Sequence, residues 1–222
     1  MRHLLQPRVL KVASLAAAAS TLACYPRLAL WLHRPAPLWY LEATIFICCI
    51  LLWGFVFAWH EPYTHRPALL WKLDPLPLGV ATLTGLGTAA AFHLWLDPSL
   101  RSKFPEEYPP DLTHWLATVP FILGFNQLFL IFAPFDWLMR LSKNPTLATT
   151  LTGLLGAGLL LMKIHTLSAT LEPSLLAVLL AGRLVAGFLV VWFYVRGGVW
   201  LVCWWALLLE GRHLLDFAPA TP

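Results

Sequence analysis

The chain has 222 residues, of which 59% are hydrophobic and only 12% are charged, and its mean hydropathy is +0.70. Soluble domains carry about 25% charged residues, so this composition excludes a soluble protein and indicates an integral membrane protein. The net charge of +4 requires no nucleic-acid partner, because Lys and Arg in short loops set topology and face anionic lipid.

Apolar runs divide the chain into helices, because a span of the bilayer core needs about 20 apolar residues. In chain order we predict spans at residues 10–32, 39–59, 76–96, 115–139, 147–165, 174–195 and 199–215. The last span has only eleven uncharged residues before Glu210, so it is short, tilted or shielded by protein. The predicted fold class is an all-α polytopic transmembrane bundle of six to seven spans, and residues 1–222 form a single integral membrane domain.

The N-terminus has the outline of a signal peptide, because basic residues precede the apolar run VASLAAAASTLAC. We interpret this run as an uncleaved first helix, since the rest of the chain is also membrane-embedded. A cleaved signal peptide remains the alternative. We expect a multi-pass protein of a bacterial inner (plasma) membrane.

The distribution of Lys and Arg gives a small positive-inside excess if the N-terminus is cytoplasmic. Eight such residues then lie inside: Arg2, Arg8, Lys11, Arg66, Lys72, Arg140, Lys143 and Arg196. Five lie outside: Arg27, Arg34, Arg101, Lys103 and Arg212. In this orientation the longest outer loop is LDPSLRSKFPEEYPPDLTH, which we expect to be a solvated, partly extended connector.

Arg183 lies near the middle of the predicted span 174–195. A charge at the bilayer centre costs about 2.5–3.5 kcal/mol on insertion scales, and Arg cannot lose its proton. It therefore needs an acceptor, for which Glu210 is the first candidate, with Asp136 and Glu42 behind it. Two interpretations stay open: Arg183 locks helices together, or it binds at a polar cavity.

Glu210 and His213 are three residues apart and so share one face of a helix. That spacing suits a metal ligand pair, a proton relay or an interfacial helix end. A third ligand is not evident, so we predict no metal and no cofactor. His165, at the end of the fifth span, is either an interfacial residue or a functional one.

The stretch GFNQLFLIFAPFDWL places the adjacent amides of Asn126 and Gln127 inside an apolar run. An amide has no useful pKa, so neither side chain can act as a general base. Both can hydrogen-bond across helices, for about 0.6 kcal/mol on average in membrane proteins.

The stretch from Leu180 to Val202 reads LAGRLVAGFLVVWFYVRGGVWLV. With the polar residues before and after it, this stretch resembles the CAAX protease and bacteriocin-processing (CPBP, or Abi) family of intramembrane proteases. Tyr194, Gly198 and Trp200 fit a signature that the family carries between its last two motifs. The resemblance covers about residues 115–215.

The motifs of that family are a Glu-Glu pair followed by an Arg, then Phe-x-x-x-His, then His-x-x-x-Asn. Carried onto this chain, they fall in that order on Asn126-Gln127, Ile131, Leu161 to His165, Ala206 and Glu210. Only the His at 165 is kept. In the family a Glu activates water while His and Asn residues position it and stabilise the oxyanion. The resemblance therefore makes Asn126, Gln127, His165 and Glu210 the catalytic-site positions, although most of the family's catalytic side chains are replaced there.

These observations lead to a functional prediction with two rivals. The leading hypothesis is a CPBP-like protein without standard protease activity that binds a membrane partner or lipid-linked molecule in a polar intramembrane cavity, with Arg183 and His213 as binding residues. The first rival is an active CAAX-type endopeptidase in which Glu210, paired with His165, is the relocated carboxylate. The second is a small transporter or channel. The expected partners are membrane lipids and a membrane protein or lipidated peptide.

Overall fold

The computed structural model describes residues 4–31, 34–167 and 171–217; Arg2 and the predicted end of the first span, at residue 32, lie outside these ranges. Within them the secondary structure is helical, without strands, which confirms the all-α class. The α-helices are α1 (Pro7–Leu30), α2 (Leu38–Thr64), α3 (Pro75–Ala91), α4 (Asp97–Leu100), α5 (Leu112–Phe121), α6 (Ala133–Ser142), α7 (Pro145–Thr166) and α8 (Pro173–Glu210).

Among the described residues, six continuous helical segments are long and apolar enough to cross a membrane. They are Pro7–Leu30, Leu38–Thr64, Pro75–Leu100, Leu112–Ser142, Pro145–Thr166 and Pro173–Phe217. The chain is therefore a multi-pass membrane protein. The predicted sixth and seventh spans both lie within the last segment, which is 45 residues long.

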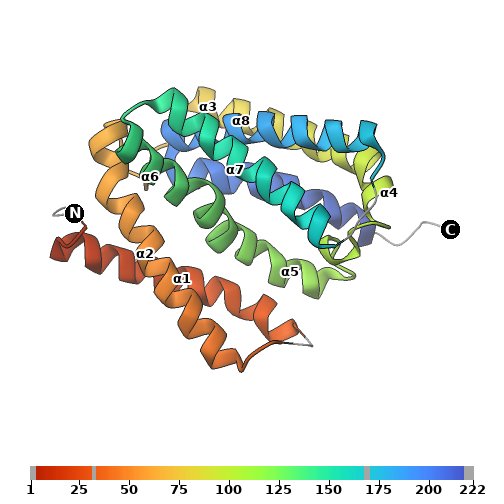
Figure 1. Ribbon diagram of the computed structural model, residues 1–222, viewed down its shortest axis with the longest axis horizontal. Coiled ribbons are helices and arrows are strands. Elements are labelled where there is room, and N and C mark those ends of the chain that lie inside the picture. The colour runs from red at the N-terminus through yellow and green to blue at the C-terminus, as the bar shows by residue number, and fades with distance from the viewer. Residues whose placement is uncertain (1–3, 32–33, 168–170, 218–222) are drawn as a thin grey trace.

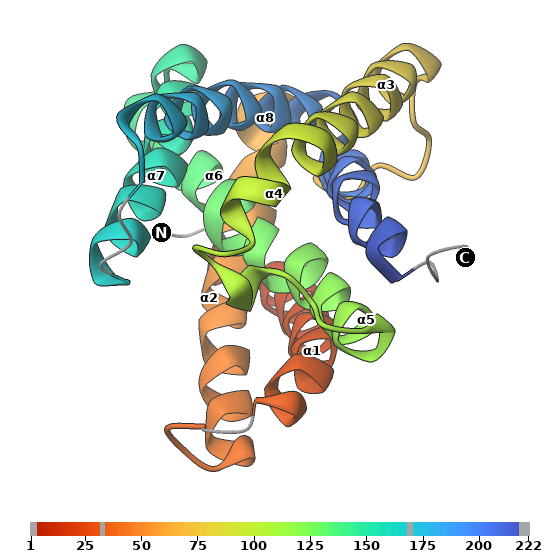
Figure 2. The same ribbon diagram turned by 90° about the vertical axis from the view of Figure 1, so that its right-hand side faces the viewer.

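A backbone break at Gly198 separates these two predicted spans. Gly198 has φ 65° and ψ −160°, which no residue of an α-helix adopts. The blue ribbon of α8 turns there, and its second arm runs back toward the C-terminus (Figures 1 and 2). The amide of Val199 donates to the carbonyl oxygen of Ala68 at 2.9 Å, which ties the break to the connection between α2 and α3.

Local sequence signals account for several helix ends. Asp111 caps α5 by accepting the amide of His114 at 2.8 Å, and Asn144 caps α7 by accepting the amide of Leu147 at 3.1 Å. Prolines stand in the first turns of α1, α3, α7 and α8, where no hydrogen bond is lost. His65, with φ 58°, ends α2 in a left-handed conformation.

The helix that carries Asn126 and Gln127 is not α-helical throughout. Two π-helical turns, Ile122–Asn126 and Leu128–Phe132, lie between α5 and α6, so that Gln127 stands between them. A π-turn inserts a residue into the helical ladder and is frequent at functional sites. This irregularity was not predicted.

The core lies where α2, α6 and both arms of α8 meet, and it contains the fully buried Phe132, Phe193 and Tyr194. Small residues allow close helix crossings at its margin: a Cβ on Gly187 of α8 would lie 2.8 Å from the Cα of Gly153 in α7. In Figure 2, α1 and α2 project together below the rest of the bundle.

The predicted outer connector is more structured than expected. It contains α4 and a 3-10 turn, Pro105–Glu107, and Phe104 is only 4% exposed because it packs with Leu100 and Leu179. Residues 101–111 and the C-terminal turn Gly211–Phe217 meet here, through the ion pair of Arg101 with Asp216. We call this end of the bundle the loop end.

Candidate functional site

The positions that the family resemblance made catalytic differ in their surroundings. Asn126 and Gln127 are half-buried, and neither side chain forms a hydrogen bond within the described residues. His165 is exposed in the last turn of α7. Glu210 ends α8 with a side chain that is 15% exposed.

Arg183 is exposed on the first arm of α8. Within the described part of the chain it has no ion pair within 4.0 Å, so the predicted pairs with Glu210, Asp136 or Glu42 do not form at that distance. Asp136, one of these candidate acceptors, is occupied by other partners.

Glu210 and His213 are brought together at the loop end, as their spacing predicted. Glu210 Oε2 lies 3.8 Å from Nε2 of His213, whose side chain is 1% exposed. On the other side of the imidazole, Nδ1 of His213 lies 3.7 Å from Oδ2 of Asp216. Neither ring nitrogen has a hydrogen-bond partner among the described residues. A buried polar side chain without a partner is rare in folded proteins.

Ion pairs surround this histidine. The guanidinium of Arg212 lies 3.1 Å from Oδ2 of Asp97, whose side chain is 2% exposed. Arg101 pairs with Asp216 at 2.5 Å. The Tyr108 hydroxyl donates to Oδ1 of Asp97 at 2.9 Å; burial, followed by this bond to a carboxylate, raises the pKa of Tyr108. Ion pairs and a hydrogen bond thus connect residues 101–111, α4 and the C-terminal turn.

A second polar cluster lies deep in the core, and sequence reasoning missed its histidine. Nδ1 of His60 lies 3.0 Å from Oδ1 of Asp136, and the Tyr194 hydroxyl donates to Oδ2 of the same carboxylate at 2.6 Å. Asp136 was noticed only as an acceptor for Arg183, and Tyr194 only for the family signature. The sequence did contain one signal: His60 and Asp136 lie near the ends of two apolar helices, where a polar side chain needs a buried partner.

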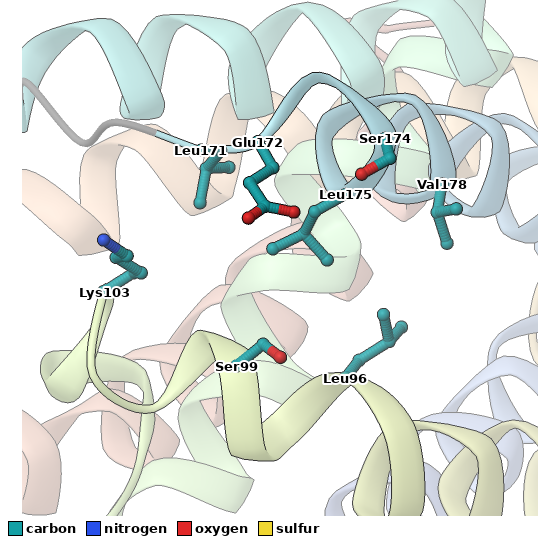
Figure 3. A pocket seen from close by; sticks show the side chains of 8 residues that line it. All are labelled: Leu96, Ser99, Lys103, Leu171, Glu172, Ser174, Leu175 and Val178. Carbon is teal, nitrogen blue, oxygen red and sulfur yellow. The ribbon is translucent and has the colours of Figure 1, made fainter.

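The described residues also line a pocket of 460 Å³ at the loop end, between the end of the α3–α4 helix and the start of α8. Figure 3 shows Leu96, Ser99 and Lys103 on one wall and Glu172, Ser174, Leu175 and Val178 on the other, with Leu171 beside Glu172. Its size is typical of small-molecule sites. None of the catalytic or binding residues predicted from the sequence lines it.

Within the described ranges no group of three His, Cys, Asp or Glu side chains is arranged to hold a metal ion. The fold and this polar loop end define the class of the protein as a multi-pass α-helical membrane protein. Comparisons with protein-family models, with curated proteins and with solved structures found no match.

Proposed function

We propose that this protein binds an amphiphilic, lipid-linked molecule in the loop-end pocket and does not hydrolyse it. The observation that carries the proposal is the lining of that pocket, where a basic and an acidic side chain stand beside an apolar wall at the end of two spanning helices. This pocket replaces the cavity that sequence reasoning placed around Arg183.

The two kinds of lining match the two parts of an amphiphile. Lys103 and Glu172 carry opposite charges, and Ser99 and Ser174 add hydroxyl groups, so the polar side suits a zwitterionic head group. Leu96, Leu175 and Val178 offer an apolar surface that continues along the spanning helices, which suits an acyl or prenyl chain.

Residues at the family's catalytic positions support binding rather than hydrolysis. Hydrolysis needs a group that takes a proton from water. The amides of Asn126 and Gln127 cannot do so, and His165 is exposed on α7 without a carboxylate ion pair within the described ranges. We therefore propose a CPBP-like scaffold that keeps the helix arrangement of the family but lacks most of its catalytic side chains.

The turn at Gly198 gives this scaffold proposal structural support. The signature that resembles the CPBP family includes Tyr194, Gly198 and Trp200, and in this chain the first is fully buried while the second forms the break in α8. A position that requires positive φ explains why a glycine stands there.

The test is binding of lysophosphatidylethanolamine, a zwitterionic single-chain lipid, to the full chain in detergent micelles. Val178→Trp fills the pocket and Lys103→Gln removes its cation, and each should weaken binding about tenfold or more, which corresponds to about 1.4 kcal/mol. Val185→Trp is the matched control, because Val185 lies on the same arm of α8, is 67% exposed and does not line the pocket.

Lys143→Gln is the control for charge, because Lys143 ends α6 and does not line the pocket. Equal binding by wild type, Val178→Trp and Lys103→Gln would reject this pocket as the site.

A further inference from the structure

The charged side chains at the loop end do not balance. Among the described side chains within 4.0 Å of one another, three carboxylates, those of Asp97, Glu210 and Asp216, meet two guanidinium groups, those of Arg101 and Arg212. Arg183 acts on Glu210 only from a greater distance. A buried charge without a partner is costly, and such a group tends to be neutralised instead. The cluster therefore calls for one more positive charge, or for one carboxylate that is not ionised.

The distances identify which carboxylate is left over. Asp97 holds Arg212 at 3.1 Å and Asp216 holds Arg101 at 2.5 Å. Glu210 lies 3.8 Å from Arg212, beyond hydrogen-bond length, and its carboxylate has no hydrogen bond within the described residues. Its other close polar neighbour is Nε2 of His213, also at 3.8 Å.

His213 is suited to be the partner of this extra carboxylate. Its side chain is 1% exposed, and in the part of the chain that the structure describes neither ring nitrogen has a hydrogen-bond partner. Charged and titratable groups from every neighbouring element surround the two side chains. The loop supplies Arg101, Glu107 and Tyr108, α4 supplies Asp97, and the first arm of α8 supplies Arg183. The C-terminal turn supplies Arg212 and Asp216, and His93 lies near Asp216. Glu107 is itself paired with Lys163.

We propose that Glu210 and His213 form a proton-binding acid–base couple that holds one proton between them. In its resting form the proton is on Glu210 and His213 is neutral, because a neutral pair costs less in an apolar bundle than an ion pair that lacks a direct hydrogen bond. Transfer breaks the O–H bond of Glu210 and forms an N–H bond at Nε2 of His213, directly after a small approach or through one bridging water. No other reactant is needed.

The surroundings hold the couple in place while leaving it accessible. The indole Nε1 of Trp115 donates to the main-chain carbonyl of Glu210 at 2.9 Å and fixes the end of α8. The Glu210 side chain is 15% exposed, so a proton from the loop-end surface can reach it, whereas His213 is closed off. This site is separate from the pocket, with which it shares no lining residue.

Infrared spectroscopy of the full chain near pH 7 tests the proposal, because a protonated carboxylic acid has a C=O stretch that an ionised carboxylate lacks. The wild-type spectrum should contain this stretch, and Glu210→Gln should remove the intensity of one carboxyl group. Glu61→Gln, at an exposed carboxylate outside the pocket, should leave it unchanged.

His213→Asn supplies a second readout if Glu210→Gln fails to fold. It removes the proton acceptor, so the midpoint at which the Glu210 stretch disappears should move by about one pH unit or more, which is a tenfold change in proton affinity. Absence of the stretch from wild type, its full persistence in Glu210→Gln, or an unchanged midpoint in His213→Asn would each overturn the couple. None of these results bears on lipid binding in the pocket.

Discussion

His60 and Asp136 face each other in the core with Nδ1 and Oδ1 3.0 Å apart, and each side chain is only 1% exposed. The hydroxyl of Tyr194 completes the cluster at 2.6 Å, and its ring centre lies 4.3 Å from that of His60. These contacts join α2, α6 and the first arm of α8 close to the break at Gly198. The cluster therefore fixes the opposite end of the bundle from the loop end.

Removal of the shared carboxylate should destabilise the fold strongly. Asp136→Ala leaves His60 and Tyr194 buried without their partner, and loss of one member of a buried pair costs about 3–5 kcal/mol. Tyr194→Phe removes one buried hydrogen bond and leaves an oxygen of Asp136 without this partner, which should cost about 1–3 kcal/mol. Denaturant unfolding in micelles measures both.

Asp74→Ala is the control for these two substitutions. Asp74 forms an exposed ion pair with Arg66 at 3.8 Å, so its replacement should change the free energy of unfolding by less than about 1 kcal/mol. Equal stability of Asp136→Ala and Asp74→Ala would contradict a structural role for the cluster.

Gly198→Ala should disrupt the turn in α8. Its φ of 65° with ψ of −160° is a region that only glycine adopts readily and costs an L-residue about 1–3 kcal/mol, and a Cβ would also overlap the carbonyl oxygen of Ala68. We expect a loss of more than about 2 kcal/mol in the free energy of unfolding, measured as above. Gly182→Ala, in the first arm of α8 with no atom within 4 Å of its added Cβ, should be neutral or stabilising. A tolerated Gly198→Ala would show that the break is not needed.

The start of α5 should loosen in acid. The amide and side chain of His114 donate to Asp111 and lower the pKa of its carboxylate below the ordinary value of 3.8. Because the folded pKa is the lower one, the stabilisation is fully present above pH 3.8 and is lost as pH falls through the folded pKa. Hydrogen exchange of the His114 amide should accelerate across this window, beyond its intrinsic pH dependence. Asp111→Asn should abolish that step, and an identical profile in both proteins would count against the cap.

Ordinary CAAX-type protease activity should be absent. On the proposed CPBP-like scaffold, Asn126 and Gln127 would stand where that family carries its Glu pair, and an amide cannot accept a proton from water. Purified protein incubated with a prenylated peptide should release no cleaved product above the level of protein-free micelles, as measured by mass spectrometry. Cleavage that disappears in Glu210→Gln would instead support the relocated carboxylate.

The spans were predictable because hydrophobic length is a local property of the sequence. Even the separation of residues 174–195 from 199–215 was anticipated, and it coincides with the break at Gly198. The π-helical turns beside Gln127 were not. The proximity of Glu210 and His213 followed from helical periodicity, since the two are close in sequence.

Longer-range partners escaped prediction for a physical reason. His60 and Asp136 are 76 residues apart, and nothing local indicates that their helices cross at these positions. Arg183 was expected to need a buried acceptor, but the first arm of α8 turns this side chain outward instead. The loop-end pocket joins α4 to the start of α8, and its residues carry no motif.

Photolabelling can show directly whether an amphiphile occupies the loop-end pocket. A lysophosphatidylethanolamine with a photoreactive group in its acyl chain is irradiated with the full chain, and the labelled residues are located by mass spectrometry. In wild type we expect labels at Leu175 and Val178. The label at Leu175 should fall about tenfold in Val178→Trp and persist in Val185→Trp. Labels spread evenly over the lipid-exposed helices, or unchanged by Val178→Trp, would contradict it.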